Sequence, residues 1–334
     1  MPTLHIPYAQ VTSLLTQILE QSTAMLPARA ALCARLFADA SRDGVPSHGL
    51  NRFALLLKWI HAGTVIPNAE PTRVAGIGGL ERWDGNFGPG PSNAWHSMAR
   101  AIELARTHGI GCVALRNTNH WMRAGNYGWQ AADAGCFGIC WTNTIALMPA
   151  WGGRTRTRRL GNSPLVMALP RQGGAHLVLD MAMSQYSMGK LSLFKQAGTQ
   201  APLPAGFDLA GNETRDPAAI LAGGSGMPIG HWKGAGLAML LDVFAASLAG
   251  GNATHQLRAD NNERGVSQIF MAISANALDG AAELSRIVEA VVADVQSEGA
   301  AYPGQRSVAA RRESEQAGVP VDEAVWNGIL ALRK

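Results

Sequence analysis

A histidine and an arginine, His48 and Arg52, lie four residues apart in the segment SHGLNRF (47–53). On a helix this spacing would place both side chains on one face, about one turn apart. An imidazole can give or take a proton near neutral pH, and a guanidinium can hold a carboxylate through paired hydrogen bonds. A lone histidine is more often a surface residue, but this pair suits the chemistry of a 2-keto or 2-hydroxy acid. The segment therefore predicts an acid–base histidine that the adjacent positive charge keeps neutral.

A second histidine, His120, lies in the polar segment NTNHWMRAGNYGWQ (117–130). It follows an apparent strand and precedes a turn punctuated by glycines, where reactive groups often collect. The aromatic residues Trp121, Tyr127 and Trp129 either line a flat pocket or pack in the core, and core packing is the commoner role. His120 is therefore a second candidate for proton transfer.

Three segments could hold a dinucleotide. Two apolar runs around Pro170 predict a β-hairpin that ends at Asp180, whose carboxylate could accept a ribose hydroxyl or cap a turn. Lys233 follows Trp232 at the start of a predicted helix, where phosphate groups bind favourably. Arg306 follows a Pro-Gly turn and could meet a phosphate or only solvent.

The glycine pattern excludes one common cofactor fold. The chain has 38 glycines but no GxGxxG, the turn that a classical dinucleotide-binding domain places between a strand and a helix. The alternation of strands and helices is also too irregular for a doubly wound sheet. A nicotinamide cofactor would therefore be bound without a classical Rossmann domain.

Hydrophobic periodicity predicts a chain that is helical at its start and mixes helices with strands in its middle. Helices are expected over residues 8–21, 27–43, 51–61, 92–107, 236–248, 281–298 and 322–332. Short apolar runs predict buried strands over residues 112–115, 137–141, 165–169, 177–181 and 269–273. We expect two subdomains. Residues 1–75 with about 299–334 would form a helical one, and about 76–298 an α+β one that binds cofactor and substrate.

The composition indicates a compact globular protein. Of 334 residues, 47% are hydrophobic and 16% are charged, which favours an enzyme or an oligomer with buried surfaces. The net charge of +4 is scattered apart from one arginine cluster at 154–159, so no nucleic-acid partner is expected. The four cysteines form neither a disulfide framework nor a paired zinc motif, so we expect no metal and a reducing compartment.

No secretion signal is visible in the first residues of the chain. The most apolar stretch, 234–250, is interrupted by Asp242 and is expected to be too short to cross a bilayer. The sequence thus predicts a cytoplasmic protein without a membrane partner.

Taken together, these segments resemble the malate/L-lactate dehydrogenase family that lacks a Rossmann fold, and within it the branch of the 2,3-diketo-L-gulonate reductases. The resemblance covers essentially the whole chain. It is carried by SHGLNRF (47–53), GIGCVALRNTNHWMRAGNYGWQAADAG (109–135), GICWTNTIALMPAWGG (138–153), LDMAMS (179–184), WKGAGLAMLLD (232–242) and GVSQIFMAI (265–273). The pair Trp121 and Trp129, with WTN (141–143), favours the diketogulonate branch over the malate relatives.

The resemblance implies NAD(H)-dependent hydride transfer in a homodimer, on an unusual α+β fold with a mixed sheet. By position, His48 matches the proton donor of the family, Arg52 a carboxylate contact, and His120 a second histidine that some relatives use as the acid–base. Cofactor contacts are implied in three segments, which comprise His176, Leu177, Val178, Leu179, Asp180, Met181 and Ala182, then Trp232 and Lys233, then Gly304, Gln305 and Arg306.

The chain departs from the family pattern at two places. It has GNSP (161–164) where relatives often have Gly-Thr-Asn-Pro, and Gln305 and Arg306 where an acidic residue is usual. An acidic group can bond ribose hydroxyls and repel a 2′-phosphate, whereas an arginine can bind one. NAD is therefore the expected cofactor, with NADP as the alternative.

These observations lead to the hypothesis of an oxidoreductase that reduces the 2-keto group of a keto-sugar acid, 2,3-diketo-L-gulonate to 3-dehydro-L-gulonate. Malate, L-lactate, ureidoglycolate and a cyclic imino acid are alternative substrates because they share a carboxylate beside a reducible carbon. From another class, the chain could be a non-catalytic sugar-acid or nucleotide-binding protein. The presence of His48, Arg52, His120 and Lys233 argues against this alternative.

Overall fold

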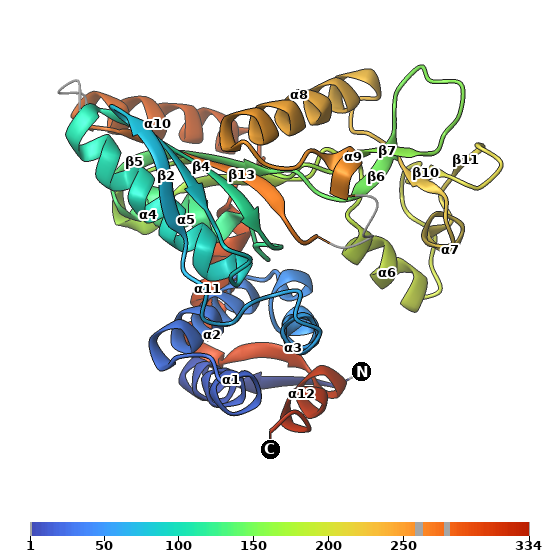
Figure 1. Cartoon of the computed structure of the whole chain (residues 1–334), viewed down its shortest axis with the longest axis horizontal. Helices are drawn as coiled ribbons and strands as arrows, with labels where there is room; N and C mark the ends of the chain where they lie inside the picture. The colour runs from blue at the N-terminus through green and yellow to red at the C-terminus, as the bar shows by residue number, and fades with distance from the viewer. Residues whose placement is uncertain (1, 258–262, 277–280, 334) are drawn as a thin grey trace.

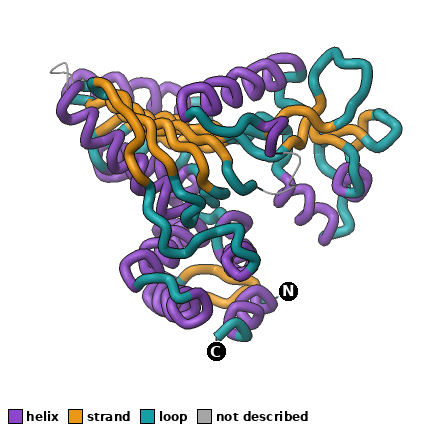
Figure 2. Tube along the Cα trace, viewed as in Figure 1, coloured by secondary structure: helices purple, strands orange, loops and turns teal. Residues whose placement is uncertain are grey.

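A computed structural model of the chain describes residues 2–257, 263–276 and 281–333. A region built on a β-sheet carries the long helices α8 (Trp232–Ala249) and α10 (Ala281–Ser297) along its upper side in Figure 1. A smaller, mainly helical region lies below it and contains both chain termini. Figure 2 shows the strands of the sheet side by side, with helices above and below them.

The lower region begins with helices α1 (Tyr8–Thr23), α2 (Pro27–Arg42) and α3 (Phe53–His61). Each buries one apolar face, as the helical spacing of the sequence predicts. Pro27 occupies the first turn of α2, where its missing N–H costs no hydrogen bond. The buried faces of the three helices form one apolar cluster.

The last part of the chain completes the same region. Strand β1 (Thr3–Ile6) pairs antiparallel with β14 (Val319–Asp322), so both ends of the chain share a two-stranded sheet. Helix α12 (Glu323–Leu330) follows, and the Asp322 carboxylate caps it by accepting hydrogen bonds from the amides of its first turn. Helix α11 (Gln305–Ala317) leads from the upper region to β14 (Figure 1).

The main sheet is mixed and has seven strands. Their order is β2 (Thr72–Ile77), β3 (Leu80–Asp84), β4 (Ile110–Thr118), β13 (Val266–Ser274), β5 (Cys136–Thr142), β8 (Leu165–Leu169) and β9 (Leu177–Met181). Only β3 and β4 run parallel to each other; the remaining neighbours are antiparallel. The predicted hairpin is confirmed as the antiparallel pair β8 and β9.

Helices cover both faces of this sheet. Helices α4 (Gly90–His108) and α5 (Gly125–Asp133) bury one face, and α8 packs on the other. Gly128 allows α5 to approach the sheet closely, since a Cβ there would lie 2.6 Å from a methyl group of Val166. The layers therefore place α5 directly against β8.

A small extension lies beside the main sheet, at the right of Figure 1. It consists of short elements: β6 (Ala146–Pro149), β7 (Arg158–Gly161), α6 (Met188–Gln196), β10 (Gly206–Phe207), β11 (Glu213–Thr214), α7 (Pro217–Leu221), β12 (Ser225–Gly226) and α9 (Thr254–Leu257).

Within the described ranges, α8 is the one helix that is long and apolar enough, by length and composition, to cross a membrane. The expectation that this stretch is too short was wrong, because the helix starts before residue 234 and has 18 residues. Ala238 and Ala245 on its inner face pack against the sheet, and Asp242 accepts a hydrogen bond from the amide of Thr254. Such packing is typical of a helix that belongs to a folded domain.

The α+β class and all five predicted strands are confirmed, and the predicted helices occur with shifted ends. The helix expected over residues 92–107 begins earlier, at Gly90, because Pro89 holds the cap position, and the Ser92 hydroxyl donates to the Pro89 carbonyl from within the first turn. Among the α-helices and strands of the described residues, those that were not predicted are β1, β2, β3, α5, β6, β7, α6, β10, β11, α7, β12, α9, α11 and β14.

Candidate active site

A cavity of about 1160 Å³ lies where the lower region meets the β8–β9 edge of the sheet. Its walls come from residues 43–52, from the segment after β4, from β9, and from the turn that precedes α11. Pockets for small ligands usually measure about 300–1,000 Å³. The cavity is therefore large enough to hold more than one small molecule.

The predicted acid–base pair lies on this cavity, but not on one helix. Its residues belong to two separate 3₁₀ turns, Pro46–His48 and Leu50–Arg52. Gly49 between them has non-helical angles (φ −106°, ψ −125°), and a Cβ there would lie 2.3 Å from Ser41 Oγ. The expected shared helix face was therefore wrong, because the close contact of Gly49 with α2 interrupts the helix.

His48 faces the cavity from the first of these turns. Its Nδ1 lies 3.2 Å from the Ser47 hydroxyl, which holds the ring in place. Burial lowers the pKa of His48 to about 4, assisted by the positive charges of Arg52 and Arg123. The imidazole is therefore neutral at physiological pH in the free protein, in agreement with the sequence.

His120 lies just beyond β4, as predicted, and its two ring nitrogens have different partners. The backbone N–H of Met122 donates to Nδ1 at 2.9 Å, whereas Nε2 lies 3.2 Å from Arg52 Nη1. Because Nδ1 accepts a hydrogen bond, the proton of the neutral ring is on Nε2. Burial lowers the pKa of His120 well below its ordinary value, as do the charges of Arg52 and His48. His120 is therefore a neutral hydrogen-bond donor at the cavity.

The Nε2–H of His120 leaves Arg52 without an acceptor at that nitrogen, since two donors face each other there. Within the described part of the chain, Arg52 makes no ion pair. Its guanidinium lines the cavity and is partly buried. The arrangement leaves its N–H groups available to a carboxylate ligand.

Glu263 also faces this part of the cavity, and the sequence did not indicate it. Its Oε2 lies 3.6 Å from Nε2 of His120, and 19% of its side chain is exposed. Burial raises the pKa of Glu263 to about 7, although the charge of Arg52 opposes this shift. No motif surrounds Glu263, so only the folded chain reveals its contact with His120.

Asp43 lines the cavity and is bound by arginines from three segments of the chain. Its carboxylate accepts hydrogen bonds from Arg311 at 2.7 and 3.0 Å, from Arg123 at 2.6 Å and from Arg42 at 2.8 Å. Burial opposes ionisation, but the Arg311 hydrogen bonds and the charges of Arg123 and Arg42 hold the Asp43 pKa well below its usual range. This cluster connects the lower and upper regions beside His48.

Strand β9 supplies a second wall. Of the predicted cofactor segment, residues 178–182 line the cavity, whereas His176 and Leu177 do not. Asp180 accepts a hydrogen bond at 2.7 Å from the amide of Gly125, at the start of α5. Burial raises the pKa of Asp180, while Arg123 and that amide favour its ionised form. The second oxygen of the Asp180 carboxylate can accept a hydrogen bond from a hydroxyl group.

His176 is held by other partners. The amide of Arg171 donates to its Nδ1 at 2.9 Å, and its Nε2 lies 2.9 Å from Asp133 Oδ1. These contacts orient its ring away from the cavity and fix the start of β9.

The turn before α11 forms a third wall through Gly304 and Arg306. Gly304 has φ +95°, and a Cβ there would lie 3.0 Å from the amide nitrogen of Val178. Only glycine combines this left-handed conformation with such a close approach to β9. The turn is further tied to the strand by a hydrogen bond from Val178 N–H to the Pro303 carbonyl.

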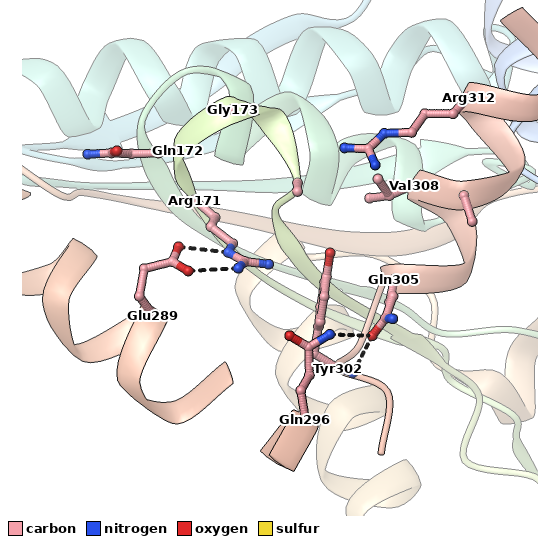
Figure 3. Close-up of a pocket in the computed structure, with 11 residues that line it drawn as sticks. Arg171, Gln172, Gly173, Glu289, Gln296, Tyr302, Gln305, Val308 and Arg312 are labelled. Carbon is pink, nitrogen blue, oxygen red and sulfur yellow. Dashed lines mark hydrogen bonds and ion pairs between the residues drawn. The ribbon is translucent and has the colours of Figure 1, made fainter. Parts of the chain in front are cut away.

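Gln305 instead lines a smaller cavity of about 520 Å³ on the other side of this turn (Figure 3). Its side-chain oxygen accepts hydrogen bonds from Gln296 and from the amide of Tyr302. Arg171 and Glu289 are joined there by two hydrogen bonds of 2.7 Å, drawn as dashed lines in Figure 3. The polar groups of this cavity are thus largely satisfied by each other.

Trp232 and Lys233 lie outside both cavities of their own chain. They begin α8 on the surface, and 65% of Trp232 is exposed.

The aromatic residues of the 117–130 segment are mainly core residues: Trp121, Tyr127 and Trp129 are all buried, although both tryptophans also touch the cavity wall.

The chain was compared with known proteins. A model of the malate/L-lactate dehydrogenase family matches residues 6–330. A relative from Citrobacter koseri named 2,3-diketo-L-gulonate reductase is 44% identical over 308 residues, which cover 90% of this chain and 92% of the relative.

Two solved structures are similar over nearly the whole chain. The structure of a Δ1-piperideine-2-carboxylate reductase from Pseudomonas syringae has a TM-score of 0.89 at 26% identity, and covers 98% of this chain and 99% of its own. The structure of a malate dehydrogenase from Entamoeba histolytica has a TM-score of 0.92 at 22% identity, and covers 99% of this chain and 97% of its own, which supports the fold alone.

Proposed function

The chain belongs to the malate/L-lactate dehydrogenase family, and we propose that within this family of oxidoreductases it reduces 2,3-diketo-L-gulonate to 3-dehydro-L-gulonate. The observation that carries the proposal is the position of His48, Arg52 and His120 on one large cavity. The name of the Citrobacter koseri relative supports the choice of substrate.

Arg52 is proposed to hold the substrate carboxylate, because its guanidinium lines the cavity without an ion-pair partner in the described chain. The Nε2–H of His120 is then available to the keto oxygen beside that carboxylate. His48 delivers the proton to the oxygen as negative charge develops there. Its low pKa in the free protein rises once an anionic substrate lies beside it, since a negative charge stabilises the imidazolium.

The cavity fits a nicotinamide dinucleotide, which supplies a hydride when bound. Residues 178–182 and Gly304 provide a backbone wall, and the free oxygen of Asp180 can accept a ribose hydroxyl. Arg306 lies where a phosphate could approach it. We propose NADH as the cofactor; NADPH is the alternative because Arg306 could also bind a 2′-phosphate.

We further propose a homodimer that forms through the outer face of α8. This face exposes a row of large apolar side chains: Trp232, Leu237, Met239, Leu240, Val243, Phe244 and Leu248. The sheet on the same side also leaves Ile110, Met167 and Leu179 exposed. Exposed apolar patches of this size mark interaction surfaces.

A second copy would also explain the position of Trp232 and Lys233. The family resemblance makes them cofactor contacts, yet they lie outside the cavity of their own chain. On a partner subunit they could reach it. We propose that this dimer is a soluble metabolic reductase and that it is located in the cytoplasm.

The test is an assay with the purified protein, NADH or NADPH, and a panel of acids. The panel contains 2,3-diketo-L-gulonate, oxaloacetate, pyruvate, the keto form of ureidoglycolate and a cyclic imino acid. We expect loss of reduced-cofactor absorbance that is fastest with diketogulonate and NADH. A faster reaction with another acid would reassign the substrate, and no reaction with any of them would favour a non-catalytic binding protein.

A further inference from the structure

Among the residues that the structure describes, Glu263 is the carboxyl group that lies beside His120 and Arg52, and the proposed mechanism does not use it. Its Oε2 lies 3.6 Å from Nε2 of His120, and Arg52 Nη1 lies 3.2 Å from that same nitrogen. Glu263 and Arg52 therefore both approach the same atom, Nε2 of His120, on the cavity surface. A substrate carboxylate held by Arg52 would lie in the immediate neighbourhood of Glu263.

The other ionisable groups nearby differ from Glu263 in their behaviour near neutral pH. His48 and His120 both have strongly lowered pKa values, because they are buried next to Arg52. Burial raises the pKa of Glu263 to about 7, although the charge of Arg52 opposes this shift. The two histidines therefore stay neutral in the free protein over a range in which Glu263 gains or loses a proton.

The remaining charged groups of the cavity lie on other walls. Lys190 lines it from α6, and Arg306 from the start of α11. Asp43 is kept ionised by its three arginines, and Asp180 is bonded to the amide of Gly125 on the cofactor wall. Burial and Arg52 shift the pKa of Glu263, and these four groups do not contribute to that shift.

Two carboxylates beside a single arginine cannot both ionise without cost, because each repels the other in a medium of low polarity. A bound substrate carboxylate neutralises the arginine that stabilises ionised Glu263 and adds a negative charge. Binding of the substrate must then favour the protonated form of Glu263. By linkage, protonation of Glu263 must favour binding of the substrate to the same extent.

We propose that Glu263 is a positioning residue that couples binding of the substrate carboxylate at Arg52 to the uptake of one proton from solution. Reduction of a keto acid consumes one proton, so this coupling brings a proton into the site together with the substrate. Protonated Glu263 also leaves Arg52 free to hold the substrate, and its own O–H can donate a hydrogen bond to the substrate. This inference rests on the proposed function, because it requires a carboxylate substrate at Arg52.

The sign of the pH dependence follows from this coupling. Below about pH 7, Glu263 is already protonated, and the apparent affinity for the acid is constant. Above about pH 7, each pH unit should weaken binding by up to tenfold, because one proton must be taken up. The effect should appear in KM and not in kcat.

The experiment compares the whole protein with two variants, Glu263→Gln and Glu263→Asp. Glutamine has the shape of protonated Glu263 and cannot ionise, so KM should be independent of pH from about 6 to 8.5 and close to the low-pH value of the wild type. Aspartate keeps an ionisable group, so a pH-dependent KM should persist. Circular dichroism and NADH affinity verify that both variants fold.

A second measurement records proton uptake without turnover. The keto acid that the wild type reduces fastest is titrated into each protein, without NADH, by calorimetry in two buffers of different ionisation enthalpy. We expect the wild type to take up at most about half a proton at pH 7 and close to one a pH unit or more above it, and Glu263→Gln to take up none.

The outcomes separate the two proposals. Equal proton uptake, or parallel KM profiles, in the wild type and Glu263→Gln would overturn the role of Glu263 and leave the proposed function intact. A wild-type protein that neither reduces nor binds any keto acid of the panel would overturn both.

Discussion

At the scale of single residues, the two histidines of the cavity differ in their hydrogen bonds and therefore in their tasks. The Met122 amide occupies Nδ1 of His120, so an added proton there would break that bond. The Nδ1 of His48 meets only a serine hydroxyl, which can donate or accept. His48 can therefore change its protonation state without loss of this partner, and we propose it as the general acid.

Replacing His48 by alanine should lower kcat by about two orders of magnitude or more, the usual effect of removing a general acid. Steady-state kinetics with NADH and the preferred keto acid measure the loss. His108→Ala, at the exposed end of α4, serves as the matched control and should keep the wild-type rate. Near-normal turnover of His48→Ala would instead give the role of proton donor to His120.

The individual side chains illustrate how far sequence reasoning reaches. The motif SHGLNRF identified His48 and Arg52 because both come from one short segment with informative residue types. Glu263 could not be identified in this way, since its partners His120 and Arg52 are far away along the chain. The assigned roles of all four residues stay predictions until variants are measured.

At the scale of elements, the sequence predicted a helix or strand correctly where the residues that specify it are neighbours in the chain. The β8–β9 hairpin was predicted because its apolar runs and the turn residues between them, Pro170, Gly173 and Gly174, are adjacent in sequence. Helix α5 was missed because Gly125 and Gly128 suggest a turn, whereas Gly128 serves close packing of α5 on β8. Helix α11 was missed because it is polar on most sides and begins directly after a Pro-Gly turn.

The Asp43 cluster joins three elements, and its removal should be costly. Asp43→Asn leaves the buried guanidinium of Arg123 without its charge partner, which typically costs about 3–5 kcal/mol for a buried pair. Denaturant unfolding at neutral pH measures this loss. Glu283→Gln, which breaks an exposed pair with Arg286, is the control and should leave the unfolding midpoint unchanged.

The same cluster should make stability depend on acid. The folded-state pKa of Asp43 is depressed, so its contribution is present above the unfolded pKa of about 3.9 and disappears as the pH falls toward the folded value. Wild-type stability should therefore decline below about pH 4 more steeply than that of Asp43→Asn. Equal slopes would show that the cluster does not govern acid unfolding.

At the scale of the whole molecule, the apolar outer face of α8 is the feature that a single chain does not explain. Its inner face is packed on the sheet, but the other side exposes large side chains, including Val243 and Phe244, each more than half exposed. Composition indicated buried interfaces, but the periodicity of α8 is too weak to show which side is outward. The subdomain boundaries at about residues 75 and 299 likewise stay predictions.

If α8 forms the dimer interface, Val243→Asp should convert the dimer to monomers, because a charge on an apolar contact surface remains unpaired there. Analytical ultracentrifugation measures the change. The variant should also bind NADH more weakly, since Trp232 and Lys233 would no longer be supplied to the partner's cavity. Leu26→Asp places the same charge on an exposed leucine elsewhere and should leave the dimer intact. A dimeric Val243→Asp would refute this interface.

The pairing of β1 with β14 has a consequence for the order in which this protein is made. The 3₁₀ turns of His48 and Arg52 lie between α2 and α3, which pack in a cluster that includes Val319, Val321 and Trp326. A ribosome releases these residues only after every strand of the main sheet has been made, so the nascent chain cannot complete that cluster earlier. The sheet can therefore fold during translation before the wall that carries His48 and Arg52 is complete. Unfinished chains would then be unable to consume reduced cofactor.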